Sequence, residues 1–254
     1  MATSSLEMEE IKPGVTWRHY VVTALATGVS AILAIYAVII APVAPFPGVS
    51  GLYLAAAVYV PLSLWLGMWG CFAGYFSQLI LGFVATPFGV WSLLWSFADF
   101  LEGFVVLLAF RIFKADVDIG ADLKRPTTVK ILLGALVANL IVAAVATALA
   151  LTTLWIITLI ITIGLLIAMY IVNPSRSWLI YVIFGIFVAA LVSAIVGISI
   201  PILGGFAPVE GFWVGLIGWF AGDLIVLAAI STALMVTLTG YIKKTSVFVE
   251  GWFS

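Results

Sequence analysis

Residues 131–172 read ILLGALVANLIVAAVATALALTTLWIITLIITIGLLIAMYIV and contain no charged residue. A helix needs about 20 residues to cross the hydrocarbon core of a bilayer, so a run of this length is too long for one crossing and can hold two. Lipid offers backbone amides no partner outside the helix. The strict alternation of a barrel strand is absent, so the run predicts two membrane helices.

The composition of the whole chain extends this prediction. Of 254 residues, 65% are hydrophobic and 8% are charged, with a mean hydropathy of +1.32, whereas soluble domains carry about 25% charged residues. We therefore expect an all-α, polytopic integral membrane bundle of about eight transmembrane helices. The expected spans are 19–41, 51–69, 71–88, 91–112, 129–150, 153–172, 178–200 and 212–241.

Two of these boundaries divide long apolar stretches, with turns expected at Gly70 and at Thr152-Thr153. The division is supported by the basic residues, because Lys and Arg accumulate in short cytoplasmic loops. With eight spans, every Lys and Arg falls on one side of the membrane. The N-terminus and the C-terminus are then cytoplasmic. The expected organisation is a polar segment 1–18, one transmembrane domain 19–244 and a short tail 245–254, in a multi-pass protein of the cell membrane.

Several functional classes are disfavoured. The net charge of −1 provides no broad basic surface for nucleic acid. The single cysteine, Cys71, excludes an internal disulfide, and the single histidine, His19, excludes metal or haem sites that need several histidines. Acid–base and metal-binding side chains are scarce, so we expect neither an enzyme nor a cofactor.

The outer connections are apolar and rich in Pro and Gly. They comprise residues 42–48, 86–89 and 201–208. Proline stiffens such loops and prevents helices from continuing. Two interpretations are open: the loops form a lid over a pocket, or they lie in the headgroup region.

Acidic residues within the spans carry the most information about function. Asp99 and Glu102 lie three residues apart, on one face of a helix. Asp223 lies about eleven residues into the last span, close to the midplane. A carboxylate there costs roughly 2.5–3.5 kcal/mol unless it is neutral, paired or hydrated. No Lys or Arg lies within a span core, so we expect a ligand or proton site. The alternatives are a hydrogen bond between packed helices, a helix-end cap, or a structural kink at Gly222-Asp223.

Other polar and aromatic residues complete the candidate ligand-binding set. Gln78, Asn139 and Trp95 lie within predicted spans. The two amides also fit a role in holding helices together, which is common in membrane bundles. In the first span, Ala24, Gly28 and Ser30 belong to stripes of small residues that let another helix approach closely. Those residues are candidate contacts with a partner subunit, or they pack inside this bundle.

Two segments carry a family resemblance. Residues 97–103, continuing to 111–114, together with Trp219 to Asp223, resemble substrate-capture subunits of energy-coupling factor vitamin transporters. That resemblance implies about six helices, a small nutrient bound near the outer face under a loop, and small residues of the first helix against a transmembrane coupling subunit. Ala24 and Gly28 would then be coupling contacts. Asp99, Glu102 and Asp223 would be positional candidates for the pocket.

The order of spans also looks like the eight-helix membrane-associated sensor domain of bacterial signalling proteins. The shared segments are 48–51, 97–113 and 219–224. Each resemblance has a departure: eight spans exceed the six of the transporter subunits, and no output domain follows Lys244.

Three functions remain open. The first is a nonenzymatic, small-molecule-binding subunit of a nutrient transporter, energised by partner ATPases because this chain has no phosphate-binding loop. The second is a sensor or scaffold that relays ligand binding to a separate protein. The third is a proton-coupled carrier that acts alone, indicated by the unpaired carboxyl groups.

Overall fold

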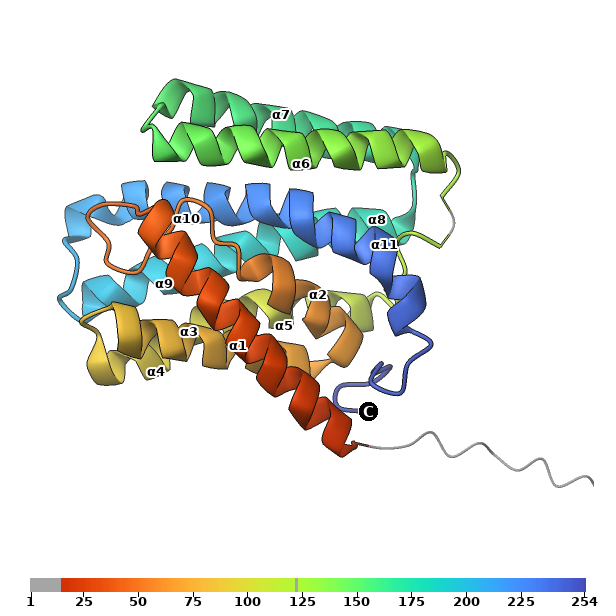
Figure 1. Cartoon of the computed structure of the whole chain (residues 1–254), viewed down its shortest axis with the longest axis horizontal. Coiled ribbons are helices and arrows are strands. Elements are labelled where there is room, and N and C mark those ends of the chain that lie inside the picture. Colours follow the sequence, from red (N-terminus) through yellow and green to blue (C-terminus); the bar gives the residue numbers. More distant parts are fainter. Residues whose placement is uncertain (1–14, 122) are drawn as a thin grey trace, which may run out of the picture.

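The computed structural model describes residues 15–121 and 123–254. These residues form helices and connecting loops without any strand, and most of the helices lie side by side while α1 crosses them at an angle (Figure 1). In chain order the elements are α1 (Trp17–Ile40), α2 (Ala56–Leu66), α3 (Met68–Ala85), η1 (Gly89–Trp91), α4 (Ser92–Trp95), α5 (Phe97–Ile112), α6 (Pro126–Ala148), α7 (Thr152–Val172), α8 (Arg176–Ile180), η2 (Tyr181–Val188), α9 (Ala189–Leu203), η3 (Val209–Gly211), α10 (Phe212–Val226), η4 (Leu227–Ser231) and α11 (Thr232–Ile242). Elements η2 and η4 are π-helical, whereas η1 and η3 are short 3-10 turns.

Seven helical stretches of the described chain are long and apolar enough to cross a membrane. They are Trp17–Ile40, Met68–Ala85, Gly89–Ile112, Pro126–Ala148, Thr152–Val172, Arg176–Leu203 and Val209–Ile242. Each matches an expected span closely at both ends. Apolar side chains face the lipid, and the helices satisfy their own backbone hydrogen bonds. The expected all-α polytopic membrane bundle is confirmed.

The expected second span, 51–69, is wrong as a continuous helix. Only Ala56–Leu66 is helical, and its 11 residues rise about 16 Å, roughly half the thickness of the hydrocarbon core. The preceding residues, Leu52 to Ala55, are irregular and mostly buried. Irregular backbone is tolerated at membrane depth where protein surrounds it. The chain therefore returns from the outer loop as a buried irregular segment followed by a half-length helix.

Both expected turns are displaced. The chain reverses at Gly67, whose φ of 61° favours glycine, and not at Gly70. Gly70 has a packing role, because a Cβ atom there would overlap the backbone of Leu62 and Ser63 in α2. The other reversal lies at Leu149 to Leu151, and Thr152 already begins α7.

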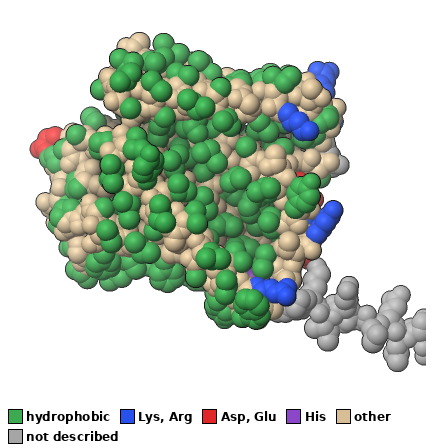
Figure 2. Space-filling view, in the orientation of Figure 1, with side chains coloured by type: hydrophobic (Ala, Val, Ile, Leu, Met, Phe, Trp, Pro, Cys, Tyr) green, Lys and Arg blue, Asp and Glu red, His purple; other side chains and the backbone are tan. Residues whose placement is uncertain are grey.

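The basic residues of the described chain gather at one end of the bundle (Figure 2). Arg18 lies at the start of α1, Arg111 at the end of α5, and Lys243 just after α11. Arg18 also donates a hydrogen bond to Ser246 of the C-terminal tail. The positive-inside rule assigns this end to the cytoplasm.

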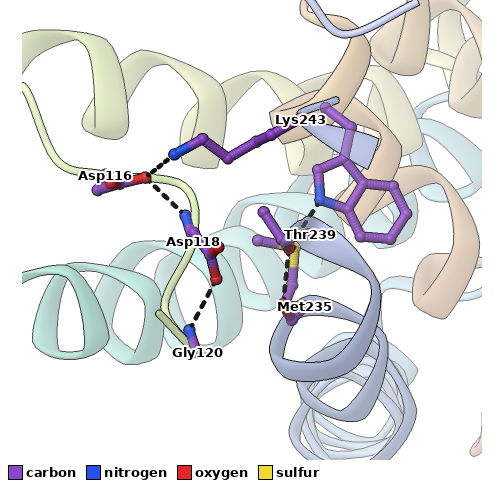
Figure 3. A network of polar contacts seen from close by, with 7 residues as sticks. Asp116, Asp118, Gly120, Met235, Thr239 and Lys243 are labelled. Atoms are coloured by element: carbon purple, nitrogen blue, oxygen red, sulfur yellow. Dashed lines mark hydrogen bonds and ion pairs between the residues drawn. The ribbon is translucent and has the colours of Figure 1, made fainter. Parts of the chain in front are cut away.

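A polar network fixes the α5–α6 loop to this cytoplasmic end (Figure 3). Lys243 Nζ lies 2.9 Å from Asp116 Oδ1, which also accepts the backbone N–H of Asp118 at 2.9 Å. The two hydrogen bonds lower the pKa of the Asp116 carboxyl below its ordinary value, although partial burial, the largest single influence, acts in the opposite direction. Asp118 in turn accepts the backbone N–H of Gly120 at 3.2 Å. The loop is therefore attached to α11.

The C-terminal tail packs under the α2–α3 turn. The backbone N–H of Val249 donates to Trp65 O at 2.9 Å, and that of Met68 donates to Trp252 O at 2.8 Å. Arg111 Nη2 donates to Val249 O at 3.0 Å. The short tail thus belongs to the folded bundle.

Helices α6 and α7 form a hairpin along one edge of the molecule (Figure 1). In an 18-residue stretch of α7, 22% of the residues are buried. In a stretch of the same length within Gly89–Ile112, 56% are buried. The two helices pack chiefly against each other and meet the remaining helices mainly through α10 and η4. Six helical segments remain outside this hairpin: α1, α2, α3, α4–α5, α8–α9 and α10–α11. We call these six segments the core bundle.

Candidate functional site: a buried carboxyl cluster

Asp99 and Glu102 lie on the inward face of α5. Their side chains have an exposed fraction of 0%, so no water-sized space adjoins them. The same face carries Gly103 and Val106. Both carboxyl groups therefore point into the core bundle, as their spacing predicts.

Tyr53 links Asp99 to α3. Its hydroxyl oxygen lies 2.7 Å from Gln78 Oε1 and 2.9 Å from Asp99 Oδ2. A phenol has only one proton to donate. Both contacts are favourable together if Asp99 carries a proton that it donates to the phenol oxygen, or if the Gln78 amide presents its nitrogen to Tyr53. The irregular segment before α2 thus supplies a side chain to the site.

Glu102 has a parallel partner in α2. The Tyr59 hydroxyl donates to Glu102 Oε2, while Oε1 has no hydrogen-bond partner among the described residues. Ser193 of α9 lies nearby. Two phenols from the broken second segment therefore each bind one carboxyl group of α5.

Asp223 approaches the same region from α10. It is fully buried and close enough to Asp99 and Glu102 for their charges to repel one another. Neither of its carboxyl oxygens has a hydrogen-bond partner among the described residues. Its neighbour Gly222 explains how α10 comes so close, because a Cβ atom there would overlap the Gly51 carbonyl group.

We call the six buried residues the carboxyl cluster: Asp99, Glu102, Asp223, Gln78, Tyr53 and Tyr59. No Lys, Arg or His of the described chain pairs with its carboxyl groups, and each basic residue lies in a loop or near a helix end. Any negative charge in the cluster must therefore be balanced by a bound cation or removed by a proton. The described residues contain no group of three or more His, Cys, Asp or Glu suited to hold a metal ion.

Two indoles border the cluster. Trp95 is fully buried and donates from Nε1 to Gly197 O at 2.9 Å. Trp219 lies near Asp223, but its N–H donates to Ser193 Oγ at 3.1 Å. The Trp219 ring centroid is 6.0 Å from that of Trp95 and 6.3 Å from that of Tyr53.

Asn139 does not belong to this site. Its Nδ2 donates to Thr158 O at 2.8 Å and to Thr162 Oγ1 at 2.9 Å, both in α7. These hydrogen bonds give Asn139 the role that was its alternative expectation, which is to hold two packed helices together. The reason is geometric, since α6 faces α7 and not α5.

The outer loops pack against Trp95 and α10 as a cap formed by Val43, Phe46, Phe88 and Phe206. Phe46 and Phe88 are 3% and 2% exposed, and they turn inward. The Phe88 ring lies 4.8 Å from the Trp95 ring and 4.9 Å from the Phe206 ring. This inward packing favours a lid over loops that spread into the headgroup region.

A cleft of about 470 Å³ separates this cap from the α6–α7 hairpin. Val43 and Gly51 line one side, Thr147 and Trp155 of the hairpin line another, and Gly218 of α10 forms part of the wall. Gly51 also contacts the backbone at Gly222. The cleft wall at Gly51 therefore touches the residue that precedes Asp223 in α10.

The small residues of α1 divide between two faces. Ala24 and Gly28 are exposed, and a Cβ atom at Gly28 would meet nothing within 4 Å. Ser30 is fully buried and so does not share a surface with them. Of these three residues, Ala24 and Gly28 are accessible from outside the bundle and Ser30 is not.

Sequence reasoning missed Tyr53, Tyr59 and Trp219. The two phenols were visible as the only tyrosines of the stretch 51–66. Their spacing of six residues does not place them on one helical face, and only the irregular backbone before α2 brings both toward α5. Trp219 lies four residues before Asp223, on the same face of α10.

No protein-family model, curated protein or solved structure matches this chain. The carboxyl cluster is therefore interpreted from its own chemistry.

Proposed function

We propose that this chain is the membrane-embedded, small-molecule-binding subunit of an uptake transporter for a vitamin-like nutrient. One observation carries the proposal: a single segment, 42–53, forms part of the outer cap and also supplies Tyr53 to the buried carboxyl cluster. Movement of that segment would open the cap and alter the cluster together. Binding under a mobile loop is a common way to capture a ligand.

The unpaired atoms of the cluster support a binding role. Asp99 Oδ1, Glu102 Oε1, Gln78 Nε2 and both carboxyl oxygens of Asp223 lack hydrogen-bond partners among the described residues. Buried polar groups without partners are expensive, and natural proteins keep few of them. The adjoining cleft has a volume in the range typical of small-molecule pockets, roughly 300–1,000 Å³.

A partner subunit is supported by the arrangement of the helices. The core bundle has six segments, which is the number implied by the resemblance to energy-coupling factor subunits, and the α6–α7 hairpin lies at its edge. Ala24 and Gly28 present an open surface on α1. We infer that a transmembrane coupling subunit, associated with ATPases, packs against this surface.

Native mass spectrometry of the detergent-purified protein tests ligand binding. We expect the wild-type chain to retain a small molecule that the double variant Asp99→Asn/Asp223→Asn loses. Glu210→Gln is the matched control, because Glu210 is an exposed acidic residue outside the cluster. A wild-type protein that retains no small molecule and copurifies with no coupling subunit would contradict the proposal.

The partner surface has a separate test. Gly28→Ile should weaken copurification with the coupling subunit but leave the melting temperature within a few degrees of wild type, since nothing lies near that position. Gly164→Ile is the control, because Gly164 in α7 is equally open but lies on the hairpin. Equal capture by both variants would exclude α1 as the coupling surface.

A second candidate, a proton-coupled carrier that acts alone, is favoured by the absence of a basic partner for the three carboxyl groups in the described chain. A proton can neutralise such a group without needing space. Liposomes that contain only this chain provide the test. Uptake driven by a proton gradient and abolished by Asp99→Asn would support this function in place of the first.

A further inference from the structure

We propose that the substrate of this site is a small organic cation; this inference rests on the proposed function and specifies its substrate class. The charge of the cluster is the first argument. Asp99 and Glu102 lie one turn apart on α5, Asp223 is near enough for its charge to interact with theirs, and no basic residue of the described chain pairs with the three carboxyl groups. An anionic substrate would meet repulsion from every ionised member. A cation would instead replace the missing counter-charge.

The hydrogen-bonding pattern is the second argument. Four of the five unpaired polar atoms of the cluster are carboxyl oxygens, which accept hydrogen bonds when ionised. The Tyr59 hydroxyl already donates to the other oxygen of Glu102, and the Tyr53 hydroxyl oxygen lies 2.9 Å from the other oxygen of Asp99. The remaining oxygens therefore lack a hydrogen-bond donor, and an ammonium group has several N–H donors. The fifth atom belongs to the Gln78 amide, whose other atom meets the Tyr53 hydroxyl.

The aromatic rings are the third argument. Trp219 lies between Tyr53 and Trp95 in a chain of ring contacts. An organic cation gains from the faces of such rings as well as from carboxylates, and indoles bind it best. A bare metal ion would gain less from them, and the described residues offer it no cluster of ligands. The combination of acids, phenols and indoles fits a cation with a carbon framework.

Access requires the segment 42–53 to move. In this structure, no water-sized space adjoins Asp99, Glu102 or Asp223. The 470 Å³ cleft ends at Gly51, whose carbonyl group touches Gly222. We infer that displacement of Gly51 from Gly222 joins the cleft to the cluster and makes room for the cation.

A panel of ammonium compounds with their carbon isosteres tests the inference on the full-length protein. Ethanolammonium against propan-1-ol is one such pair, because the two differ chiefly in the positive charge and its N–H donors. Cys71 is the only cysteine and is buried, so its reaction with a thiol-specific dye reports unfolding. We expect at least one cation to raise the melting temperature by several degrees while its neutral isostere has no effect.

The acidic residues identify where the cation binds. Asp223→Asn should weaken binding of the active cation about ten- to hundredfold, the loss expected for one charge-assisted contact. Glu210→Gln should leave it unchanged. The compound released from the purified wild-type protein by denaturation should carry a positive charge in the same experiment.

The outcomes separate the inference from the function on which it rests. A retained neutral or anionic compound would overturn the inference and leave the transporter subunit standing. The absence of any retained compound, together with no response to the panel, would overturn both. If the melting temperature depends on pH but on no compound of the panel, the cluster binds a proton and not an organic cation, and the inference is overturned.

Discussion

Asn139 in the α6–α7 hairpin and Gln78 in the core bundle are both buried amides within membrane helices, but their surroundings differ. The Asn139 amide donates two hydrogen bonds to α7, and its role ends with holding two helices together. Gln78 meets Tyr53 through one atom, while its other amide atom lacks a partner among the described residues. The buried amide of the hairpin thus has partners for its N–H groups, whereas the buried amide of the core bundle has an atom without a partner.

This difference separates structural polar groups from candidate functional ones. A polar group that only stabilises the fold is expected to find its partners within the protein. Asp223, with two unpaired oxygens, departs furthest from this expectation. Stability is therefore expected to respond in opposite directions to changes in the two regions.

The largest effect is expected where α10 touches the segment before α2. Gly222→Ala places a Cβ atom against the Gly51 carbonyl group, which cannot yield without moving the backbone. Such overpacking costs about 1–3 kcal/mol, and here we expect the upper end. Gly134→Ala in α6 is the control, because nothing lies within 4 Å of its Cβ position. It should be neutral or stabilising by up to about 1 kcal/mol.

Thermal unfolding followed through Cys71 measures both variants. If Gly222→Ala melts like wild type, α10 does not pack against Gly51 as described, and the proposed route to Asp223 fails with it.

A gain in stability is expected within the carboxyl cluster. Asp223→Asn keeps the shape of the side chain but removes an ionisable group that has no partner. A carboxylate at the centre of a span costs roughly 2.5–3.5 kcal/mol unless it is neutral, paired or hydrated, so a neutral amide in its place should recover part of that amount. The variant should melt above wild type in ligand-free detergent solution and lose ligand binding. A clear loss of stability would mean that Asp223 holds the helices together.

A loss of stability is expected when the buried amide of the hairpin is removed. Asn139→Leu keeps the branched shape of the side chain and removes both hydrogen bonds to α7. Hydrogen bonds between membrane helices contribute about 0.6 kcal/mol on average and up to about 1.7 kcal/mol. We expect a decrease of about 1 kcal/mol with ligand binding unchanged. Reduced ligand affinity in this variant would show that the hairpin belongs to the binding site. The distinction between a structural hairpin and a functional core bundle would then be wrong.

Much of the fold was predictable because lipid imposes a simple rule on composition. Long apolar runs and basic residues on one side determine the number and direction of the spans. The half-length α2 was not predictable in this way. Residues 51–69 are as apolar as a full span, and the contact of Gly51 with Gly222 depends on a helix more than 150 residues away.

The site was predictable in part, for a related reason. A carboxyl group in a span is costly wherever it points, so Asp99, Glu102 and Asp223 stood out from the sequence. Phenols and amides are cheaper to bury, so their roles depend on their neighbours. From the sequence, Asn139 and Gln78 were equally good candidates for the binding site, and Tyr53 and Tyr59 were not candidates. Only their hydrogen-bond partners in α7, α3 and α5 distinguish them.

The smallest effect is expected at the cytoplasmic loop that joins the core bundle to the hairpin. Asp116→Asn removes the ion pair with Lys243. The Asp116 side chain is 57% exposed and the Lys243 side chain is 36% exposed. Exposed ion pairs contribute little, so stability at neutral pH should fall by less than about 0.5 kcal/mol. Asp118→Asn is the control, since it can keep the hydrogen bond to Gly120.

The pH dependence of the Asp116 contribution sharpens this last test. Folding lowers the pKa of Asp116, so its contribution is fully present above the ordinary Asp value of about 3.9 and is lost as pH falls through the lower value of the folded state. The difference in melting temperature between wild type and Asp116→Asn should therefore shrink toward zero as the pH falls below about 4. A large difference at neutral pH would show that this loop holds the hairpin against the core bundle. In that case the hairpin would be an integral part of the bundle and not a peripheral element.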